Sequence, residues 1–376
     1  MKRSTLCIFA SFLAGITISS FMTRFEISKT IWLPYISTEP TTSTLINNSM
    51  LPTSSLASAS PPLKDFIVYD CSGEYPGPCG GWSDRMSGIF SAYVISVLLN
   101  RHFRIRYDNL TSYVAPHTFD WKYNDSILEG RTTSYQNFFC KTPDAVMKGD
   151  LASLRELFYT EVSFVRINWD YTAHFRKFPN LRKVIPWVLD LHFADIYLKF
   201  FKTLFMPTED LQESVNKILQ NVTKLACAHI RMGRSETIAF DDKHTDEKQV
   251  KHIWHFLKTI EEKDNYSIFV ATDAQFVRNT AKALFNQFLE VDGRILHIDR
   301  RPNGQGIVDG YRKVVLDFFV LTKCDVLVLT KSGFGMMAAY LNTKDSDLYC
   351  LTLYEVVPCS RYTLQRFYPT QILSPV

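Results

Sequence analysis

Residues 228–236 read AHIRMGRSE, a short apolar approach that ends in cationic side chains. His229 and Arg231 are two residues apart, and Gly233 follows. An arginine guanidinium offers parallel N–H donors that match the oxygens of a phosphate or a carboxylate. The pattern therefore predicts an anion site directly after a buried strand, with Arg231 as its cation.

Three other loops have residues suited to the same chemistry. Gly80 and Gly81 in CGGW have backbone amides that an anion can approach closely. Ser332 and Gly333 in KSGFG stand at the expected start of a helix, where free amides bind anions. Asp273 in ATDAQ follows an apolar run and could accept two adjacent N–H groups, such as N1 and N2 of guanine.

Together these loops indicate a ligand with a diphosphate and a polar ring, with His229 near the ribose or base. Each residue also has an ordinary structural explanation. Ser332 and Asp273 are typical helix caps, and a single histidine is often part of a core. What favours a site is that the four loops are expected at one edge of a sheet.

The elements that would position these loops follow from apolar patterning. Residues 64–71 and 102–107 are predicted strands joined by an amphipathic helix over 84–101, which makes a βαβ unit. For residues 109–180 we expect loops and short helices. Helices are predicted over 185–205 and 209–220.

The second half alternates regularly. Predicted strands over 224–230, 267–272, 294–298 and 325–330 are followed by helices over 247–262, 274–288, 310–323 and 336–342. Near-continuous apolar strands that alternate with helices favour a parallel sheet covered on both faces, with ligands at the carboxyl ends of its strands. We expect an α/β protein with an N-terminal α/β domain over 64–214 and a C-terminal one over 215–376.

The N-terminus predicts a membrane anchor. Lys2 and Arg3 precede an apolar stretch over 6–22, which is typical of a signal anchor within residues 1–23, with a cleaved signal peptide and a secreted protein as the alternative. A Ser/Thr/Pro-rich stem follows over 24–63. The rest of the chain would then lie in the lumen of the secretory pathway.

Cysteines and glycosylation acceptors agree with that location. We expect disulfides between Cys71 and Cys79 and between Cys350 and Cys359, while Cys227 is the candidate for a cysteine that stays free or pairs elsewhere. Asn-X-Ser/Thr acceptors occur at Asn47, Asn109, Asn124, Asn221 and Asn265.

Composition excludes other classes of protein. The net charge is only +4 over 376 residues, which disfavours a nucleic-acid partner. The sequence has no CxxC pair or His/Cys cluster typical of a zinc site, so no zinc site is expected.

Four patches resemble one enzyme family. HIRMGR is similar to the His-X-Arg-X-Gly motif of GDP-fucose-dependent fucosyltransferases, the superfamily with the α1,2-, α1,6- and protein O-fucosyltransferases. GGWSDRMSGIFSAYVISVLLNR resembles their N-terminal Gly-rich motif and the following helix. SIFVATD and DFFVLTKCDVLVLTKSGFGMMAAYLN resemble their second and third motifs, so that the resemblance runs in order from Tyr69 to Asn342.

The resemblance implies a GT-B fold, in which two Rossmann-like domains face a central cleft. It implies an inverting, metal-independent transfer of L-fucose from GDP-fucose to a glycan or glycoprotein acceptor. With the predicted anchor, we expect a single-pass type II protein of the Golgi or endoplasmic reticulum membrane. Arg231 would bind the β-phosphate, with Gly80, Gly81, Ser332 and Gly333 around the phosphates. His229 and Asp273 would lie at the guanosine end.

The general base is a separate prediction. Glu236 is our candidate because it lies nearest to Arg231 in the sequence, and Asp241 and Asp242 are the alternatives. Asp84 and Arg85 could line the acceptor side.

The chain departs from the family at two positions. Arg234 stands where several relatives have aspartate, and Met232 where others have a second arginine. Two alternatives therefore remain: a catalytically inactive luminal protein that binds sugar or protein, and a GT-B enzyme that uses another nucleotide sugar.

Overall fold

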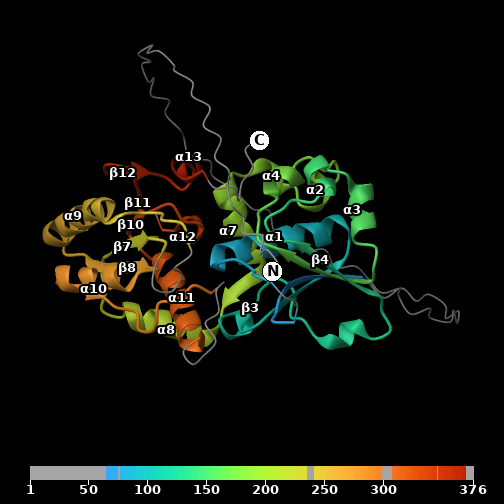
Figure 1. Cartoon of the computed structure of the whole chain (residues 1–376), viewed down its shortest axis with the longest axis horizontal. Helices are drawn as coiled ribbons and strands as arrows, with labels where there is room; N and C mark the ends of the chain where they lie inside the picture. The colour runs from blue at the N-terminus through green and yellow to red at the C-terminus, as the bar shows by residue number, and fades with distance from the viewer. Residues whose placement is uncertain (1–64, 75–76, 235–240, 299–306, 345, 370–376) are drawn as a thin grey trace, which may run out of the picture. The chain divides into compact units, whose positions relative to one another are not determined.

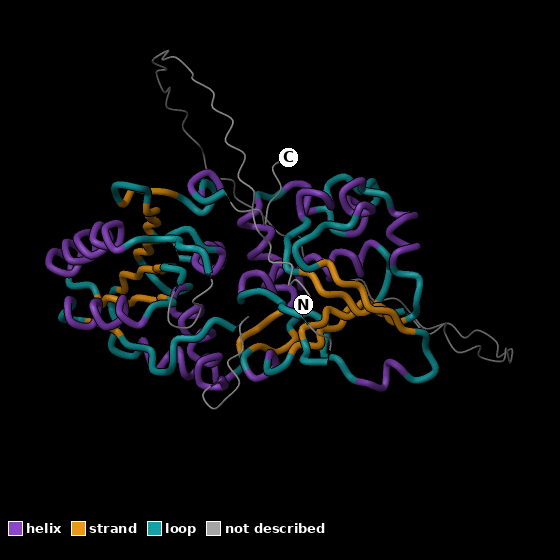
Figure 2. The backbone as a smooth tube through the Cα atoms, in the orientation of Figure 1, coloured by secondary structure: helices purple, strands orange, loops and turns teal. Residues whose placement is uncertain are grey.

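Two mainly parallel sheets organise the chain in the computed structural model (Figure 1), which describes residues 65–74, 77–234, 241–298, 307–344 and 346–369. The first sheet uses strands between Phe66 and Ile167, and the second uses strands between Leu225 and Cys359. This confirms the predicted α/β class. Figure 2 shows the strands of each sheet side by side, with helices around them.

The first sheet has the order β2-β1-β5-β4, and all of its strands are parallel. They are β1 (Phe66–Cys71), β2 (His102–Tyr107), β4 (Thr133–Phe138) and β5 (Val162–Ile167). Helix α1 (Trp82–Leu98) joins β1 to β2, which confirms the predicted βαβ unit. A Cβ on Gly88 would lie 1.8 Å from the Ile167 carbonyl oxygen, so glycine at this position lets α1 pack directly on β5.

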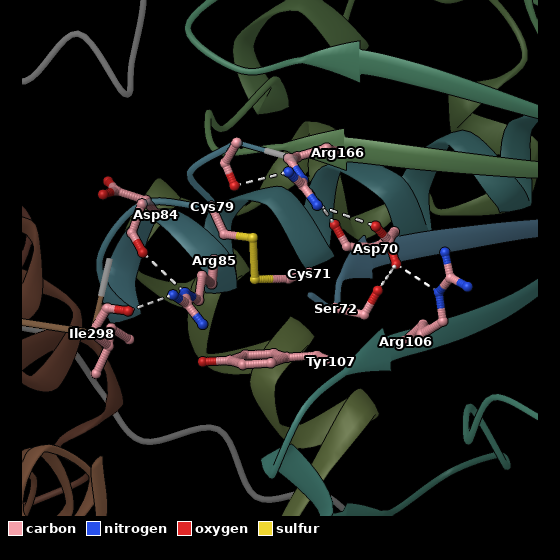
Figure 3. The surroundings of a disulfide bond; sticks show 12 residues. Asp70, Cys71, Ser72, Cys79, Asp84, Arg85, Arg106, Tyr107, Arg166 and Ile298 are labelled. Carbon is pink, nitrogen blue, oxygen red and sulfur yellow. Dashed lines mark hydrogen bonds and ion pairs between the residues drawn. A yellow bond between two sulfur atoms is a disulfide. The ribbon is translucent and has the colours of Figure 1, made fainter. Parts of the chain in front are cut away.

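Strands β4 and β5 correct the expectation of only loops and short helices over 109–180. Strand β5 contains the fully buried Arg166, a residue that argues against a core strand in the sequence. Its guanidinium donates to the buried Asp70 over 3.2 Å, and Arg106 donates to the same carboxylate over 2.6 Å (Figure 3). The remaining elements here are η1 (Leu110–Ser112), β3 (Val114–Pro116), η2 (Asp125–Leu128), α2 (Asp144–Lys148), α3 (Leu151–Leu157) and α4 (Thr172–Phe175).

The helix predicted over 185–205 is two helices, α6 (Trp187–Asp190) and α7 (Phe193–Leu204), and a further helix, α5 (Leu181–Val184), precedes them. Pro186 explains the first break, because the residue before a proline is driven out of the α region, and Ile185 has φ −141° and ψ 70°. At the second break the ring of His192 caps α7 by accepting from the Ala194 amide. Strand β6 (Phe205–Pro207), which pairs with β3, and α8 (Glu209–Leu219) follow.

The second sheet has the order β12-β11-β10-β7-β8-β9, parallel except for the antiparallel pair β11–β12. Its strands are β7 (Leu225–Ile230), β8 (Ser267–Thr272), β9 (Phe288–Leu289), β10 (Val326–Leu329), β11 (Asp347–Leu351) and β12 (Val356–Cys359). Its helices are α9 (Glu247–Asp264), α10 (Gln275–Leu284), α11 (Ile307–Leu321) and α12 (Gly333–Leu341), and α13 (Leu364–Phe367) follows. Three of the four strands predicted here are confirmed.

The fourth prediction is wrong: residues 294–298 form no strand, and β9 lies earlier, where the sequence predicted the end of a helix. Ile295 and Ile298 are both buried, a spacing of three that does not suit a strand. The Ile298 carbonyl accepts from Arg85 of α1 over 2.9 Å. This apolar run is therefore an irregular segment packed near the start of α1.

Disulfides join Cys71 to Cys79 and Cys350 to Cys359, as predicted. Of the two alternatives for Cys227, the structure shows the second: it is bonded to Cys324 and is not a free thiol. The two residues lie far apart in sequence, on β7 and just before β10. Only the sheet topology, which pairs β7 with β10, brings them together.

Residues 64–376 form one compact unit. Its largest apolar core includes residues from both sheets and their helices, and the boundary proposed between 214 and 215 stays a prediction. The anchor and stem over 1–63 lie outside the described residues. Within the described ranges, no helix combines the length and apolarity needed to span a bilayer.

Candidate functional site

The predicted residues converge on one cleft of about 240 Å³. Its lining includes six of the seven residues that we assigned to the nucleotide: Gly81, His229, Arg231, Asp273, Ser332 and Gly333. They come from the start of α1, the carboxyl ends of β7 and β8, and the start of α12. Parallel strands bring these ends to one edge, as the sequence analysis assumed.

Arg231 follows β7 and is 14% exposed at its side chain. Its backbone amide donates to the Thr330 hydroxyl over 2.9 Å, which ties it to the end of β10. Its guanidinium donates to Asp273 over 2.8 Å and also to Asp241. The cation is therefore fixed at the cleft wall by two carboxylates.

Asp273 anchors the loop that carries Arg231. One carboxylate oxygen accepts from the Met232 amide over 2.7 Å, and the other accepts from the Gly233 amide over 3.0 Å. With the Arg231 bond, this carboxylate already accepts three hydrogen bonds within the protein. Its assignment to guanine stays a prediction, and its contacts are those of a loop anchor.

Gly233 makes the turn after Arg231 possible. Its φ is +67°, and a Cβ there would lie 1.8 Å from the Asp242 carbonyl oxygen. Arg234 also has a positive φ, of 45°, and its side chain is exposed. Glu236, our candidate base, lies outside the described residues.

Asp241, which we weighed as a base, is instead an ion-pair partner. Burial would raise the pKa of its carboxyl, but a hydrogen bond from His244 and the charge of Arg231 outweigh burial and lower the pKa to about 2. A carboxylate with so low a pKa is a poor proton acceptor at neutral pH. The structure thus favours a role in holding Arg231.

His229 is buried, and its Nδ1 has no hydrogen-bond partner among the described residues. Burial, with a smaller contribution from Arg231, lowers the pKa of its ring to about 4. His229 is therefore neutral at physiological pH. Gly335 lets α12 approach it closely, since a Cβ there would lie 2.8 Å from Nδ1.

Helix α12 begins at the cleft, where the sequence predicted an anion site that stays a prediction. Ser332 is its N-cap in an extended conformation, and the serine side chain makes no capping bond. The first amides of a helix have no intrahelical acceptor and lie at the positive end of its dipole. Ser332, Gly333 and the neighbouring Lys331 all line the cleft.

The Gly80–Gly81 loop contributes less directly than predicted. The Gly81 amide donates to Asp84 over 2.8 Å, which makes it part of the cap of α1. Gly80 has φ +85° and is not part of the cleft lining, and its carbonyl accepts from Arg85 over 2.9 Å. These glycines shape the rim, and their contact with phosphates stays a prediction.

The sequence analysis missed a buried ion pair in the cleft wall. Lys313 and Asp317 lie one turn apart on α11, and the ammonium is 2.8 Å from both carboxylate oxygens. Asp317 lines the cleft. Burial raises the pKa of Asp317, and Lys313 acts against that shift. The detectable signal was two opposite charges four residues apart on the helix predicted over 310–323.

Metal binding has no obvious centre here. Among the residues that the structure describes, no three His, Cys, Asp or Glu side chains are grouped so as to hold a metal ion. Whether the reaction needs a metal stays an open prediction.

Comparison with known proteins gives a likeness of fold. The sequence matches no family model and no curated protein. The α-1,6-fucosyltransferase NodZ from Bradyrhizobium is 12% identical, over 79% of this chain and 99% of that chain, with a TM-score of 0.46. NodZ has also been crystallised with GDP and soaked with GDP-fucose.

Two further solved structures are similar. A mutant of FUT1 from Arabidopsis thaliana, in complex with GDP, is 14% identical over 81% of this chain and 73% of that chain, with a TM-score of 0.48. POFUT1 in complex with GDP is 10% identical over 77% and 99%, with a TM-score of 0.35. The chain is similar in fold to these structures, at low sequence identity.

Proposed function

We propose that this chain is an inverting glycosyltransferase of the GT-B class that transfers L-fucose from GDP-fucose to a glycan or glycoprotein acceptor without a metal ion. One observation carries the proposal. The loops whose sequences resemble the three fucosyltransferase motifs line a single cleft, with Arg231 and the start of α12 in its wall.

The donor's diphosphate suits the two cationic features of the cleft. Breaking the bond between fucose and GDP leaves negative charge on the β-phosphate. Arg231 and the free amides of α12 can stabilise that charge in place. Asp241 competes for the same guanidinium, so we expect the diphosphate to weaken the Arg231–Asp241 contact when it binds.

The guanosine end would lie near His229. A neutral imidazole in a buried position offers one donor and one acceptor without bringing a second positive charge beside Arg231. Glu236 is the base that the sequence alone predicts, and it lies outside the described residues. The resemblance and the apolar N-terminal stretch support a luminal location in the Golgi or endoplasmic reticulum, with the membrane bound through the anchor.

The first experiment is ligand-induced thermal stabilisation of the purified chain by GDP, UDP and CMP. A ligand at 100 times its dissociation constant stabilises the folded state by about 2.7 kcal/mol. We expect GDP to raise the melting temperature and UDP and CMP to leave it unchanged. Stabilisation by UDP alone would instead indicate another nucleotide sugar.

A second experiment separates an enzyme from a binding protein. The chain is incubated with labelled GDP-fucose on a glycan array, and transferred fucose and released GDP are both measured. Stabilisation by GDP without transfer or hydrolysis would indicate a non-catalytic binding protein. Met232 and Arg234, which differ from the residues of the family motif, are the reason to test this alternative.

A further inference from the structure

A second cavity, of about 140 Å³, adjoins the cleft. Leu296, His297 and Ile298 line both spaces and so form the wall between them. The rest of its lining comes from α1, the end of β2 and α11: Arg85, Tyr107, Asp108, Asn109 and Tyr311.

Arg85 fixes this shared wall. Its buried guanidinium donates to the Ile298 carbonyl and to the Gly80 carbonyl, each over 2.9 Å (Figure 3). It also lies over the ring of Tyr107, 4.8 Å from the centroid. The hydroxyl of Tyr311 donates to that of Tyr107 over 2.5 Å. The segment 296–298 is therefore held against α1 and β2 by buried polar contacts.

His297 is the member of the shared wall that can exchange a proton, because its neighbours are leucine and isoleucine. Its Nε2 and Cε1 lie 3.7 Å from where a Cβ on Gly81 would be, so the ring faces the start of α1. Asp241 pairs with Arg231, and a positive charge on His297 is one of the smaller causes that lower the pKa of Asp241. The imidazole thus lies between the proposed phosphate site and the second cavity.

The second cavity has the chemistry of a sugar subsite. It has room for one sugar ring, with a carboxylate and an amide at its rim, Asp108 and Asn109, to bind hydroxyl groups. Tyr107 and Tyr311 supply apolar surface. It adjoins the cleft on the side of α1 and β2, away from Arg231 and the start of α12.

We propose that the second cavity binds the acceptor sugar and that His297 is the general base of the reaction. This rests on the proposed fucosyl transfer. The acceptor hydroxyl oxygen bonds to C1 of fucose while the bond from C1 to the β-phosphate oxygen breaks, and its electron pair leaves with GDP. The hydroxyl proton passes to Nε2 of His297, which later releases it to water.

The test compares His297→Gln with wild type in the full-length chain. Loss of a general base typically costs about 10²–10⁴-fold in rate. We expect fucose transfer to a glycan array to fall by that factor, while stabilisation by GDP stays unchanged. His252→Gln, on the exposed face of α9, is the matched control and should transfer at the wild-type rate.

Two further measurements distinguish a base from a structural residue. The wild-type rate should fall tenfold per pH unit on the acid side as His297 becomes protonated, and His297→Gln should lack this limb. Added imidazole should partly restore transfer by His297→Ala.

Asn109 tests the cavity separately, because it begins an Asn-Leu-Thr glycosylation acceptor. A glycan there would block the cavity, so peptide mapping of active protein should find Asn109 without a glycan.

The outcomes separate this assignment from the proposed function. If wild type transfers fucose and His297→Gln transfers equally well, or keeps the acid limb, His297 is not the base. Loss of GDP binding in His297→Gln would place the ring at the donor instead and would also overturn the assignment. If wild type neither binds GDP nor transfers fucose, the proposed function fails together with this inference.

Discussion

At the scale of single residues, the contacts that order the loop after β7 also fix the guanidinium of Arg231, the proposed phosphate ligand. It donates to Asp273 and Asp241, while Asp273 also accepts the two amides that follow Arg231 in the chain. A side chain ordered in this way loses little conformational entropy when an anion binds. The same contacts show that Asp273, a carboxylate that follows a strand, stabilises the Arg231 loop through its own hydrogen bonds, without any ligand.

Replacing Arg231 by alanine should leave the chain folded and abolish transfer. Loss of one donor to the developing charge costs about 3–4 kcal/mol of barrier, or roughly 10²–10³-fold in rate. GDP-fucose turnover and circular dichroism measure the two effects. Arg182→Ala, at a surface ion pair on α5, is the control. Near wild-type turnover by Arg231→Ala would refute the phosphate assignment.

Gly233→Ala tests whether the turn after Arg231 needs glycine because a side chain would clash, and not only because its φ is positive. We expect weaker GDP binding and a lower melting temperature, because the new Cβ would meet the Asp242 carbonyl. Gly130→Ala is a matched control, since Gly130 has the same φ of +67° with no atom within 4 Å. It should show only the backbone cost, about 1–2 kcal/mol.

Equal effects of the two glycine substitutions would mean that the close approach at Gly233 is relieved at no cost. The loop would then be adaptable, and Gly233 would matter only through its backbone conformation.

At the scale of elements, the parallel sheets explain why the sequence predicted most of the cleft. Apolar strands followed by loops with charge or glycine identify the carboxyl ends of β7, β8 and β10, and topology brings those ends together. The sequence did not predict the position of His297, because residues 294–298 have the apolar composition of a strand but pair with no other strand. The position of this segment depends on the hydrogen bond from Arg85 to the Ile298 carbonyl, across 213 positions of the sequence.

Buried charge hid β5, because Arg166 lies where local patterning expects an apolar residue. Lys313 and Asp317 did not hide α11, which was predicted as a helix over 310–323, but their burial was not predicted. Each is stable only through a partner, and for Arg166 that partner is on another strand. For Arg166 the sequence shows neither the partner nor the burial, whereas Lys313 and Asp317 can be recognised as an i, i+4 pair but not as a buried one.

The disulfide between Cys227 and Cys324 should stabilise the second sheet more than the local one between Cys350 and Cys359. The first spans 97 positions and the second 9. The chain-entropy model assigns these loops about 4.7 and about 2.7 kcal/mol. We expect Cys227→Ala/Cys324→Ala to lower the melting temperature more than Cys350→Ala/Cys359→Ala, in matched thermal unfolding. The reverse order would show that closure of the long loop is not what stabilises this sheet.

At the scale of the whole molecule, two buried groups give the stability opposite dependences on pH. Burial lowers the pKa of His229 from 6.5 to about 4, so the unfolded chain binds its proton more tightly. The free energy of unfolding therefore falls as pH drops from 6.5 towards 4. Burial raises the pKa of Asp170 from 3.8 to about 6, against hydrogen bonds from Thr172, so the folded chain binds that proton more tightly. Its contribution falls as pH rises from 3.8 to 6.

These contributions are each about 3 kcal/mol at about 1.4 kcal/mol per pKa unit, and they oppose each other between pH 4 and 6. Urea unfolding at several pH values measures them in wild type and in two variants. Relative to wild type, His229→Asn should gain stability as pH falls through this window, and Asp170→Asn should lose it. Asp241, with a pKa lowered to about 2, contributes its change below pH 3.8 and leaves the window undisturbed. If both variants kept the wild-type slope, neither group would be buried as described. The conclusion that His229 is neutral in the cleft would then be wrong.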